Sequence, residues 1–304
     1  MAAPDHLATS RHPAGTWHHA AASDGTRIAW RADGRAGMRT AIMLSNGIAC
    51  TDQYWRQLVP ALANERLVVR WDYRGHGRSD APADRDAIGP HALAGDLVTV
   101  LDAAGIERVV LVGHSYGVQV SLAAAPALGG RLAGLAAIGG TARHPLRSAV
   151  GPIPVHAALP LLAEIATLAP GSARATWQRI WGGVLPYWVA RGIGGTSRAA
   201  PRDVMDDFSR HVAGLDPLLL ARMMREMDAY DASSTLADLV VPVLALAGAR
   251  DRITPLGAMR TVAELAPRGA LAVHPRATHT LPVEHAGWVC RQLAPLLAGA
   301  DERP

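Results

Sequence analysis

The sequence contains no lysine, so all 30 of its basic residues are arginines. These arginines are spread along the chain among 26 acidic residues, and the net charge is only +4 at pH 7. No block of five or six like charges occurs. Because a nucleic-acid surface needs a basic stripe, we do not expect the protein to bind nucleic acid.

Long hydrophobic runs and cysteines are also scarce. We find no unbroken apolar stretch of about 18 residues, which excludes a typical membrane-spanning helix. The first residues, MAAPDHLATSRHPAGTW, lack the apolar segment of a secretory signal. The spacing of Cys50 and Cys290 indicates neither a metal site nor a disulfide framework. We therefore expect a cytoplasmic protein with two reduced thiols and no metal or organic cofactor.

What the sequence does contain is a regular alternation of strand-like and helix-like segments. The chain has 304 residues, 49% of them hydrophobic, which is enough for a sizeable core. Short apolar runs typical of buried strands occur at 26–32, 40–45, 66–72, 108–113, 131–140, 241–248 and 269–275. Helical spacing occurs at 53–63, 91–105, 116–128, 255–266 and 284–297. Such alternation predicts parallel βαβ units and an α/β fold.

This alternation stops between residues 141 and 237. Strand-like runs are absent there, and tryptophans, methionines, prolines and helical patterns replace them. We therefore predict an α/β core made of residues 1–140 and 238–304, interrupted by a helical insert at 141–237.

One serine lies between two glycines at the change from strand to helix. The segment from Gly113 to Gly117, GHSYG, fits the pattern G-x-S-x-G of a nucleophile elbow. A serine on so sharp a turn is held in a strained backbone conformation with its hydroxyl exposed. Small neighbours are required because strand and helix nearly touch. The pattern predicts that Ser115 is a nucleophile.

The elbow and four further segments resemble the α/β-hydrolase fold family. These segments are SNG at 45–47, WDYRGHGRSD at 71–80, LAGARDRITP at 246–255 and RATHTLPVEH at 276–285. The resemblance extends from about Arg27 to Leu297, apart from the insert. It implies a mostly parallel, twisted sheet flanked by helices, with the insert forming a helical cap, or lid, over the serine.

In this fold the catalytic triad follows the order serine, acid, histidine. His279 is our choice for the base because it follows the last strand in a short loop; His274 and His285 are its rivals. Asp251 follows the strand at 241–248 and is our choice for the acid that orients the base. The resemblance further implies an oxyanion hole built from the backbone N–H groups of Tyr116 and Ile48.

The substrate pocket is less well defined by the sequence. Asn46 stands where the family usually has a histidine, and Gly47 lets the backbone approach the substrate. The insert supplies apolar side chains suited to an acyl or alkyl group, among which we select Trp177, Trp181, Trp188 and Met224. With no charged clamp evident in the insert, we expect an uncharged, apolar small molecule.

The loop that contains Arg74, His76, Arg78 and Asp80 has two interpretations. Its polar side chains either contact substrate or stabilise a glycine-rich turn, and we favour the second.

Together these features predict a serine hydrolase that cleaves carboxylic esters or lactones through an acyl-enzyme on Ser115. The same residues suit a thioesterase, a carbon–carbon hydrolase, an acyltransferase or a perhydrolase. A carbon–carbon hydrolase commonly has asparagine before the serine, where this chain has His114. A small-molecule receptor built on the same fold is the alternative from another class. The sequence does not indicate an oligomeric state.

Overall fold

The computed structural model describes residues 15–35, 40–148, 164 and 167–302. Its centre is an eight-stranded sheet in the order β1-β2-β4-β3-β5-β6-β7-β8. β1 and β2 pair antiparallel, as do β2 and β4, and all other pairs are parallel. The strands are β1 (His18–Ala21), β2 (Arg27–Asp33), β3 (Ala41–Ser45), β4 (Val68–Trp71), β5 (Val109–His114), β6 (Leu132–Ile138), β7 (Val243–Gly248) and β8 (Gly269–His274).

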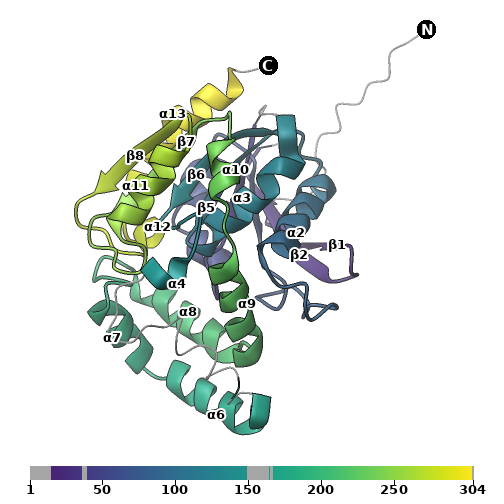
Figure 1. Cartoon of the computed structure of the whole chain (residues 1–304), viewed down its shortest axis with the longest axis vertical. Coiled ribbons are helices and arrows are strands. Elements are labelled where there is room, and N and C mark those ends of the chain that lie inside the picture. Colours follow the sequence, from purple (N-terminus) through teal and green to yellow (C-terminus); the bar gives the residue numbers. More distant parts are fainter. Residues whose placement is uncertain (1–14, 36–39, 149–163, 165–166, 303–304) are drawn as a thin grey trace.

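Helices cover both faces of this sheet (Figure 1). Strand side chains alternate between the two layers, so Met43 and Leu111 belong to one core cluster while Ile42 and Val110 belong to the other. The first cluster includes side chains of α2 (Pro90–Ala103), α3 (Tyr116–Leu128), α10 (Ser233–Ala237) and α11 (Leu256–Leu265). The second includes side chains of α1 (Val59–Ala63) and α13 (Ala286–Asp301). The predicted α/β-hydrolase fold is confirmed.

Two segments differ from the prediction. The residues predicted as one helix at 53–63 form a 3₁₀ turn, η1 (Asp52–Trp55), followed by α1. Pro60 lacks the N–H that a continuous helix would need at this point. Strand β1 was not predicted, because its sequence HHAA at the sheet edge provides no apolar run.

A group of helices lies between β6 and β7. It comprises α4 (Pro145–Ser148), α6 (Pro170–Trp181), α7 (Leu185–Gly192), α8 (Arg202–Gly214) and α9 (Pro217–Ala229). Figure 1 shows α6 to α9 together, apart from the sheet and its flanking helices. α10 instead packs on the core helices α3 and α11. The division into a core and a cap remains a prediction.

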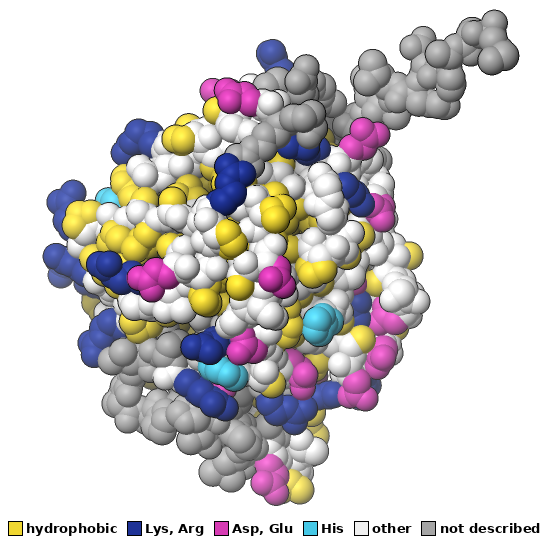
Figure 2. All heavy atoms as spheres, turned by 45° about the horizontal axis from the view of Figure 1, so that its top comes forward, with side chains coloured by type: hydrophobic (Ala, Val, Ile, Leu, Met, Phe, Trp, Pro, Cys, Tyr) yellow, Lys and Arg dark blue, Asp and Glu magenta, His cyan; other side chains and the backbone are white. Residues whose placement is uncertain are grey.

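The surface shows no segregation of charge on the face that Figure 2 displays, where arginine and acidic side chains are interspersed. Within the described ranges, no helix is both long enough and apolar enough to cross a lipid bilayer.

Candidate active site

Ser115 lies on the turn between β5 and α3 with φ +53° and ψ −116°. Side-chain-bearing residues rarely adopt a positive φ, so this backbone is strained. The flanking glycines are required by packing: a Cβ at Gly113 would lie 2.4 Å from the carbonyl oxygen of Gly117. A Cβ at Gly117 would lie 2.2 Å from the carbonyl oxygen of Ser45. The two glycines of the elbow are therefore required by close backbone contacts, within the elbow for Gly113 and with β3 for Gly117.

The structure brings the three predicted triad side chains into one hydrogen-bonded chain. Ser115 Oγ lies 3.0 Å from His279 Nε2, and His279 Nδ1 lies 3.0 Å from Asp251 Oδ2. A carboxylate can only accept, so Nδ1 carries the proton and Nε2 is left to accept from the serine hydroxyl. This tautomer is the one that a general base next to serine needs.

Parallel strands deliver these groups to one edge of the sheet, because the loops after β5, β7 and β8 all leave at the carboxyl ends of their strands. The loop after β7 holds Asp251, whose Oδ1 accepts 2.8 Å hydrogen bonds from the backbone N–H groups of Ile253 and Thr254. The orientation of the carboxylate is thus fixed from both sides.

The two rival histidines lie elsewhere. The rings of His274 and His285 stack on each other with their centroids 3.8 Å apart, and Trp288 packs against the edge of His274. Of the three candidates, only His279 hydrogen-bonds to Ser115.

His114 contacts the backbone of the predicted base, a contact that sequence reasoning missed. Its Nε2 lies 2.9 Å from the carbonyl oxygen of His279, and its ring stacks on Tyr54 with the centroids 4.8 Å apart. Burial, followed by the neighbouring His279, lowers the pKa of His114 to about 3. No local sequence signal could have revealed this contact, because the partners are 165 residues apart.

Of the two predicted oxyanion donors, Tyr116 directly follows Ser115 and Ile48 lies in the loop after β3. Tyr116 opens α3, so its N–H has no acceptor in the preceding turn of the helix. The loop after β3 runs beside the serine because Ser45 and Gly113 are paired in the sheet. A Cβ at Gly47 would lie 3.3 Å from Ser115 Cβ, so the backbone of Gly47 passes close to the serine. Among the described residues, no hydrogen bond engages the N–H of Ile48.

Asn46, one of the predicted pocket residues, is engaged by other parts of the protein. It is fully buried, and its Nδ2 donates to the carbonyl oxygen of Trp71 at 2.8 Å. Its Oδ1 accepts from Trp55 Nε1 at 2.6 Å. Both ends of the amide are therefore hydrogen-bonded inside the protein, which ties the loop after β3 to Trp71 and Trp55.

An apolar cluster connects the insert to the oxyanion loop. Ile48 packs against a group of buried residues that also receives Trp177, Trp181 and Met224 from the insert. Trp177 Nε1 donates to the carbonyl oxygen of Val212 at 2.6 Å, which fixes its ring. Three of the predicted pocket residues thus lie in the cluster that includes Ile48.

Trp188 differs from that prediction. It is 56% exposed on α7, and its ring contacts Tyr187 and the guanidinium of Arg191. It does not belong to the apolar cluster around Ile48.

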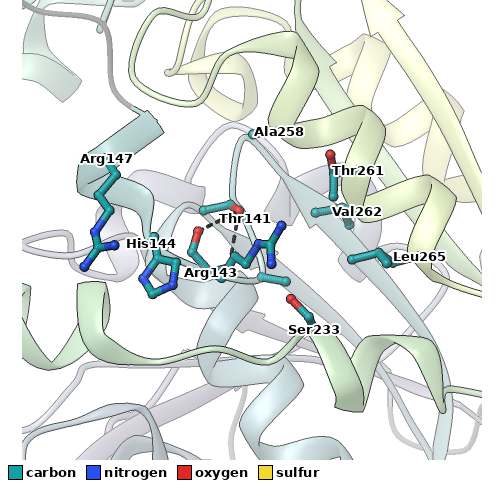
Figure 3. Close-up of a pocket in the computed structure, with 10 residues that line it drawn as sticks. Thr141, Arg143, His144, Arg147, Ser233, Ala258, Thr261, Val262 and Leu265 are labelled. Atoms are coloured by element: carbon teal, nitrogen blue, oxygen red, sulfur yellow. Dashed lines mark hydrogen bonds between the residues drawn. The ribbon is translucent and has the colours of Figure 1, made fainter.

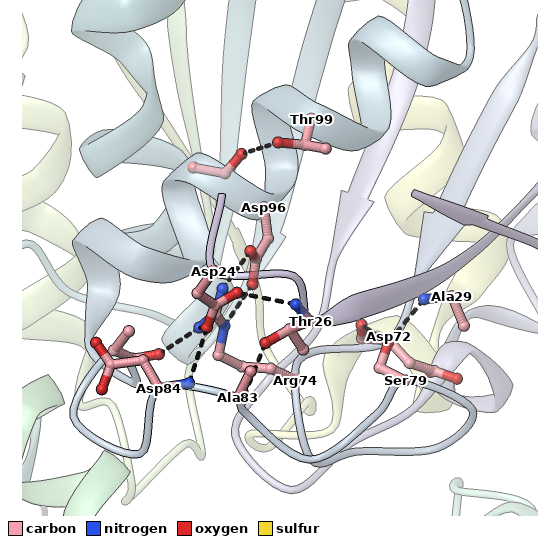
Figure 4. A network of polar contacts seen from close by, with 12 residues as sticks. Asp24, Thr26, Ala29, Asp72, Arg74, Ser79, Ala83, Asp84, Asp96 and Thr99 are labelled. Carbon is pink, nitrogen blue, oxygen red and sulfur yellow. Dashed lines mark hydrogen bonds and ion pairs between the residues drawn. The ribbon is translucent and has the colours of Figure 1, made fainter. Parts of the chain in front are cut away.

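The loop at 71–80 is mainly structural (Figure 4). Arg74 is 2% exposed and binds both oxygens of Asp96, at 2.8 and 2.6 Å, and one oxygen of Asp24 at 2.9 Å. The Arg78 guanidinium lies 4.6 Å from the centroid of the Trp17 ring. Among the described residues of this loop, two buried side-chain atoms lack a hydrogen-bond partner: Trp71 Nε1 and His76 Nε2.

Within the described part of the chain, no group of three or more His, Cys, Asp or Glu side chains could hold a metal ion. What the site offers is a strained serine hydroxyl, a base, an orienting acid and two backbone donors. This set of groups suits acyl transfer.

Comparisons with known proteins agree with this geometry. A family model described as alpha/beta hydrolase fold matches residues 40–286. A RutD protein of Caulobacter sp. (strain K31), provisionally named a carbamate hydrolase, is 28% identical over 258 residues, covering 82% of this chain and 87% of that protein.

Two solved structures illustrate the similarity of the fold. A thermophilic esterase from Thermogutta terrifontis superimposes with a TM-score of 0.73 at 22% identity, over 94% of this chain and all of the esterase. An enol-lactonase from Burkholderia xenovorans LB400 superimposes with a TM-score of 0.71 at 23% identity, over 92% of this chain and all of the lactonase.

Proposed function

Because this chain belongs to the alpha/beta hydrolase fold family, we propose that it is a serine hydrolase that cleaves carboxylic esters or lactones through an acyl-enzyme on Ser115. The observation that carries the proposal is the unbroken hydrogen-bond chain from Ser115 through His279 to Asp251. A serine hydroxyl is a weak nucleophile unless an adjacent base removes its proton, and His279 Nε2 is placed to do so.

In the first half-reaction, Ser115 Oγ attacks the substrate carbonyl as its proton moves to His279 Nε2. Asp251 stabilises the resulting imidazolium through the 3.0 Å contact at Nδ1. The N–H groups of Ile48 and Tyr116 bind the oxyanion of the tetrahedral intermediate. Collapse of this intermediate breaks the ester C–O bond, and His279 returns its proton to the leaving alcohol oxygen.

The second half-reaction regenerates the serine. Water gives a proton to His279 Nε2 and attacks the acyl carbonyl, and the same two N–H groups bind the second oxyanion. Expulsion of Ser115 Oγ, which takes the proton back from His279, releases the carboxylic acid. In a lactone the alcohol and the acid are parts of one molecule, so the product is a hydroxy acid.

The substrate class is inferred from the apolar cluster that Ile48 joins. Trp177, Trp181 and Met224 pack against the same buried residues as Ile48, the proposed oxyanion donor, and this apolar surface favours an uncharged acyl or alkyl group. The esterase, lactonase and carbamate-hydrolase names of the similar proteins fit this class, since esters, lactones and carbamates all carry a carbonyl with an electronegative leaving group.

The experiment is hydrolysis of p-nitrophenyl esters from acetate to decanoate by the wild type and Ser115→Ala. We expect kcat to fall by about a thousandfold or more in Ser115→Ala, and the chain-length optimum to measure the pocket. Ser234→Ala, at an exposed serine of α10, is the matched control and should keep full activity. Full turnover by folded Ser115→Ala would refute the proposal.

A further inference from the structure

A cavity whose lining does not include Ser115 lies where the insert joins the core. Its volume is about 370 Å³, and residues 141–144, Arg147, Ser233 and one face of α11 line it (Figure 3). Arg143 and Asp231 form an isolated antiparallel bridge beside it, which ties the segment that leaves the core to the segment that returns. We propose that this cavity binds a small organic carboxylate.

The charge of the lining selects an anion. Arg143, His144 and Arg147 contribute to the wall, and no acidic residue does. Among the described residues, the Arg143 guanidinium makes no hydrogen bond and no ion pair. Arg147 reaches Asp228 only through Nε at 3.7 Å, and its side chain is 64% exposed. The guanidinium groups of Arg143 and Arg147 thus retain free N–H donors. Either group can bind a carboxylate through two parallel hydrogen bonds.

The two nearest carboxylates do not fill this role themselves. Asp228 Oδ1 accepts the backbone N–H of Leu146 at 2.9 Å, and Asp231 Oδ1 accepts that of Ser233 at 2.8 Å. Arg143 helps to lower the pKa of Asp231, after the hydrogen bonds from Ser233. Each carboxylate is engaged by backbone, and neither lines the cavity.

The rest of the lining calls for an apolar body on the ligand. Ala258, Val262 and Leu265 present one face of α11, and Ala142 adds a methyl group from the opposite wall. An inorganic anion would leave this surface uncovered, whereas a short aliphatic carboxylate buries its chain against it. The volume falls within the usual range for small-molecule sites, roughly 300–1,000 Å³.

The cavity is connected to the triad by two short segments. Thr141 comes two residues after Gly139, where a Cβ would lie 3.3 Å from Asp251 Oδ2. α11 follows the loop that carries Asp251, and its Met259 Sδ accepts the N–H of Gly140 at 3.2 Å. A bound carboxylate would therefore contact the same segments that position the triad acid.

The test is titration of the full-length protein, labelled with [¹³C-methyl]methionine, with hexanoate. Met259 neighbours the cavity through Ala258, and Met224 lies in the apolar cluster beside Ile48, so the two methyl signals separate the two sites. Single Met→Leu variants assign the signals. No step of this test requires turnover at Ser115, so it is independent of the proposed activity.

We expect hexanoate to cause a saturable shift of the Met259 methyl signal. In the double variant Arg143→Gln/Arg147→Gln the apparent Kd should rise at least about tenfold, because charge-assisted hydrogen bonds are lost. The control Arg260→Gln/Arg291→Gln removes the same charge outside the cavity lining and should bind as the wild type does. Absence of the shift, or its full retention in Arg143→Gln/Arg147→Gln, would overturn the proposal. So would equal binding of inorganic phosphate or of hexanol, since either would show that only one half of the ligand is recognised.

Discussion

His114 Nε2 donates a 2.9 Å hydrogen bond to the carbonyl oxygen of His279, so the residue before the serine holds the backbone of the base. The carbonyl can only accept, which places the proton on Nε2 of His114. With its pKa lowered to about 3 by burial, the imidazole stays neutral. We interpret His114 as a positioning residue: it fixes the loop from which His279 Nε2 reaches Ser115.

This relationship predicts the effect of His114→Phe. Loss of one buried hydrogen bond should lower kcat about tenfold through misplacement of His279, with little change in KM. His114→Gln retains an N–H donor and should recover part of the loss. Steady-state kinetics on p-nitrophenyl butyrate, with thermal unfolding run in parallel, measures both. Equal kcat values for Phe and Gln variants of equal stability would contradict the positioning role.

The elbow glycines give a prediction about stability. Gly117→Ala should destabilise the protein by about 3 kcal/mol, because the added Cβ meets the backbone of Ser45 and neither strand nor helix can move freely. Gly95→Ala on α2 is the matched control: a Cβ there meets nothing within 4 Å. It should stabilise by roughly 0.5–1 kcal/mol. Urea unfolding measures the free energy of unfolding of both variants. Equal values for Gly117→Ala and Gly95→Ala would contradict the close packing described for the elbow.

The pair His76 and His211 predicts how stability depends on pH. Burial, and then the neighbouring His211, lowers the pKa of His76 to about 4; burial lowers that of His211 to about 4 as well. The unfolded chain, with a histidine pKa near 6.5, therefore binds more protons between pH 6.5 and 4. Stability is complete above pH 6.5 and is lost as the pH falls toward 4, with about 3 kcal/mol due to His76.

His76→Phe should make that loss of stability shallower without abolishing it, because His211 and His114, whose pKa values burial also lowers, still contribute. Urea unfolding at a series of pH values between 7 and 4 provides the measurement. His91→Phe, at an exposed position of α2, should leave the pH dependence as it is. An unchanged slope in His76→Phe would contradict the assignment of a neutral, buried imidazole.

The Arg74 network predicts a structural role without a catalytic one. Arg74→Met leaves the buried carboxylate of Asp96 unpaired and should cost about 3–5 kcal/mol of unfolding free energy. Arg78→Met should cost less than about 1 kcal/mol, since that guanidinium lies over the Trp17 ring and acts on the carboxylates of Asp52 and Asp72 without forming an ion pair in the described part of the chain. For the fraction that folds, kcat/KM should match the wild type. A tenfold fall in kcat/KM in folded Arg74→Met would instead assign Arg74 to substrate binding.

Local patterns were sufficient where chemistry and geometry are encoded in a few adjacent residues. The apolar runs identified seven of the eight strands, and the Gly113–Gly117 pattern placed Ser115 on its turn. The order of the motifs selected Asp251 and His279, which the structure brings to Ser115. Parallel strands make this possible, because the loops at their carboxyl ends converge whatever lies between them in sequence.

Contacts between distant segments were beyond the reach of such patterns. Asn46 follows a strand in a loop expected to face substrate, yet its amide is hydrogen-bonded to Trp55 and Trp71. Trp188 on α7 has the same composition signal as Trp177 on α6, and only the packing of α6 against α8 separates a clustered ring from an exposed one. The partner of His114 likewise depends on how the final loop folds back over the elbow.

The proposed reaction passes through an acyl group bound to Ser115. The most direct measurement is acid quench of the enzyme within milliseconds of mixing with p-nitrophenyl butyrate, followed by peptide mapping by mass spectrometry. We expect one butyryl group on the peptide that contains Ser115, and none in Ser115→Ala. Turnover of the ester with the adduct on another residue, or with unmodified Ser115 at every quench time, would contradict the account.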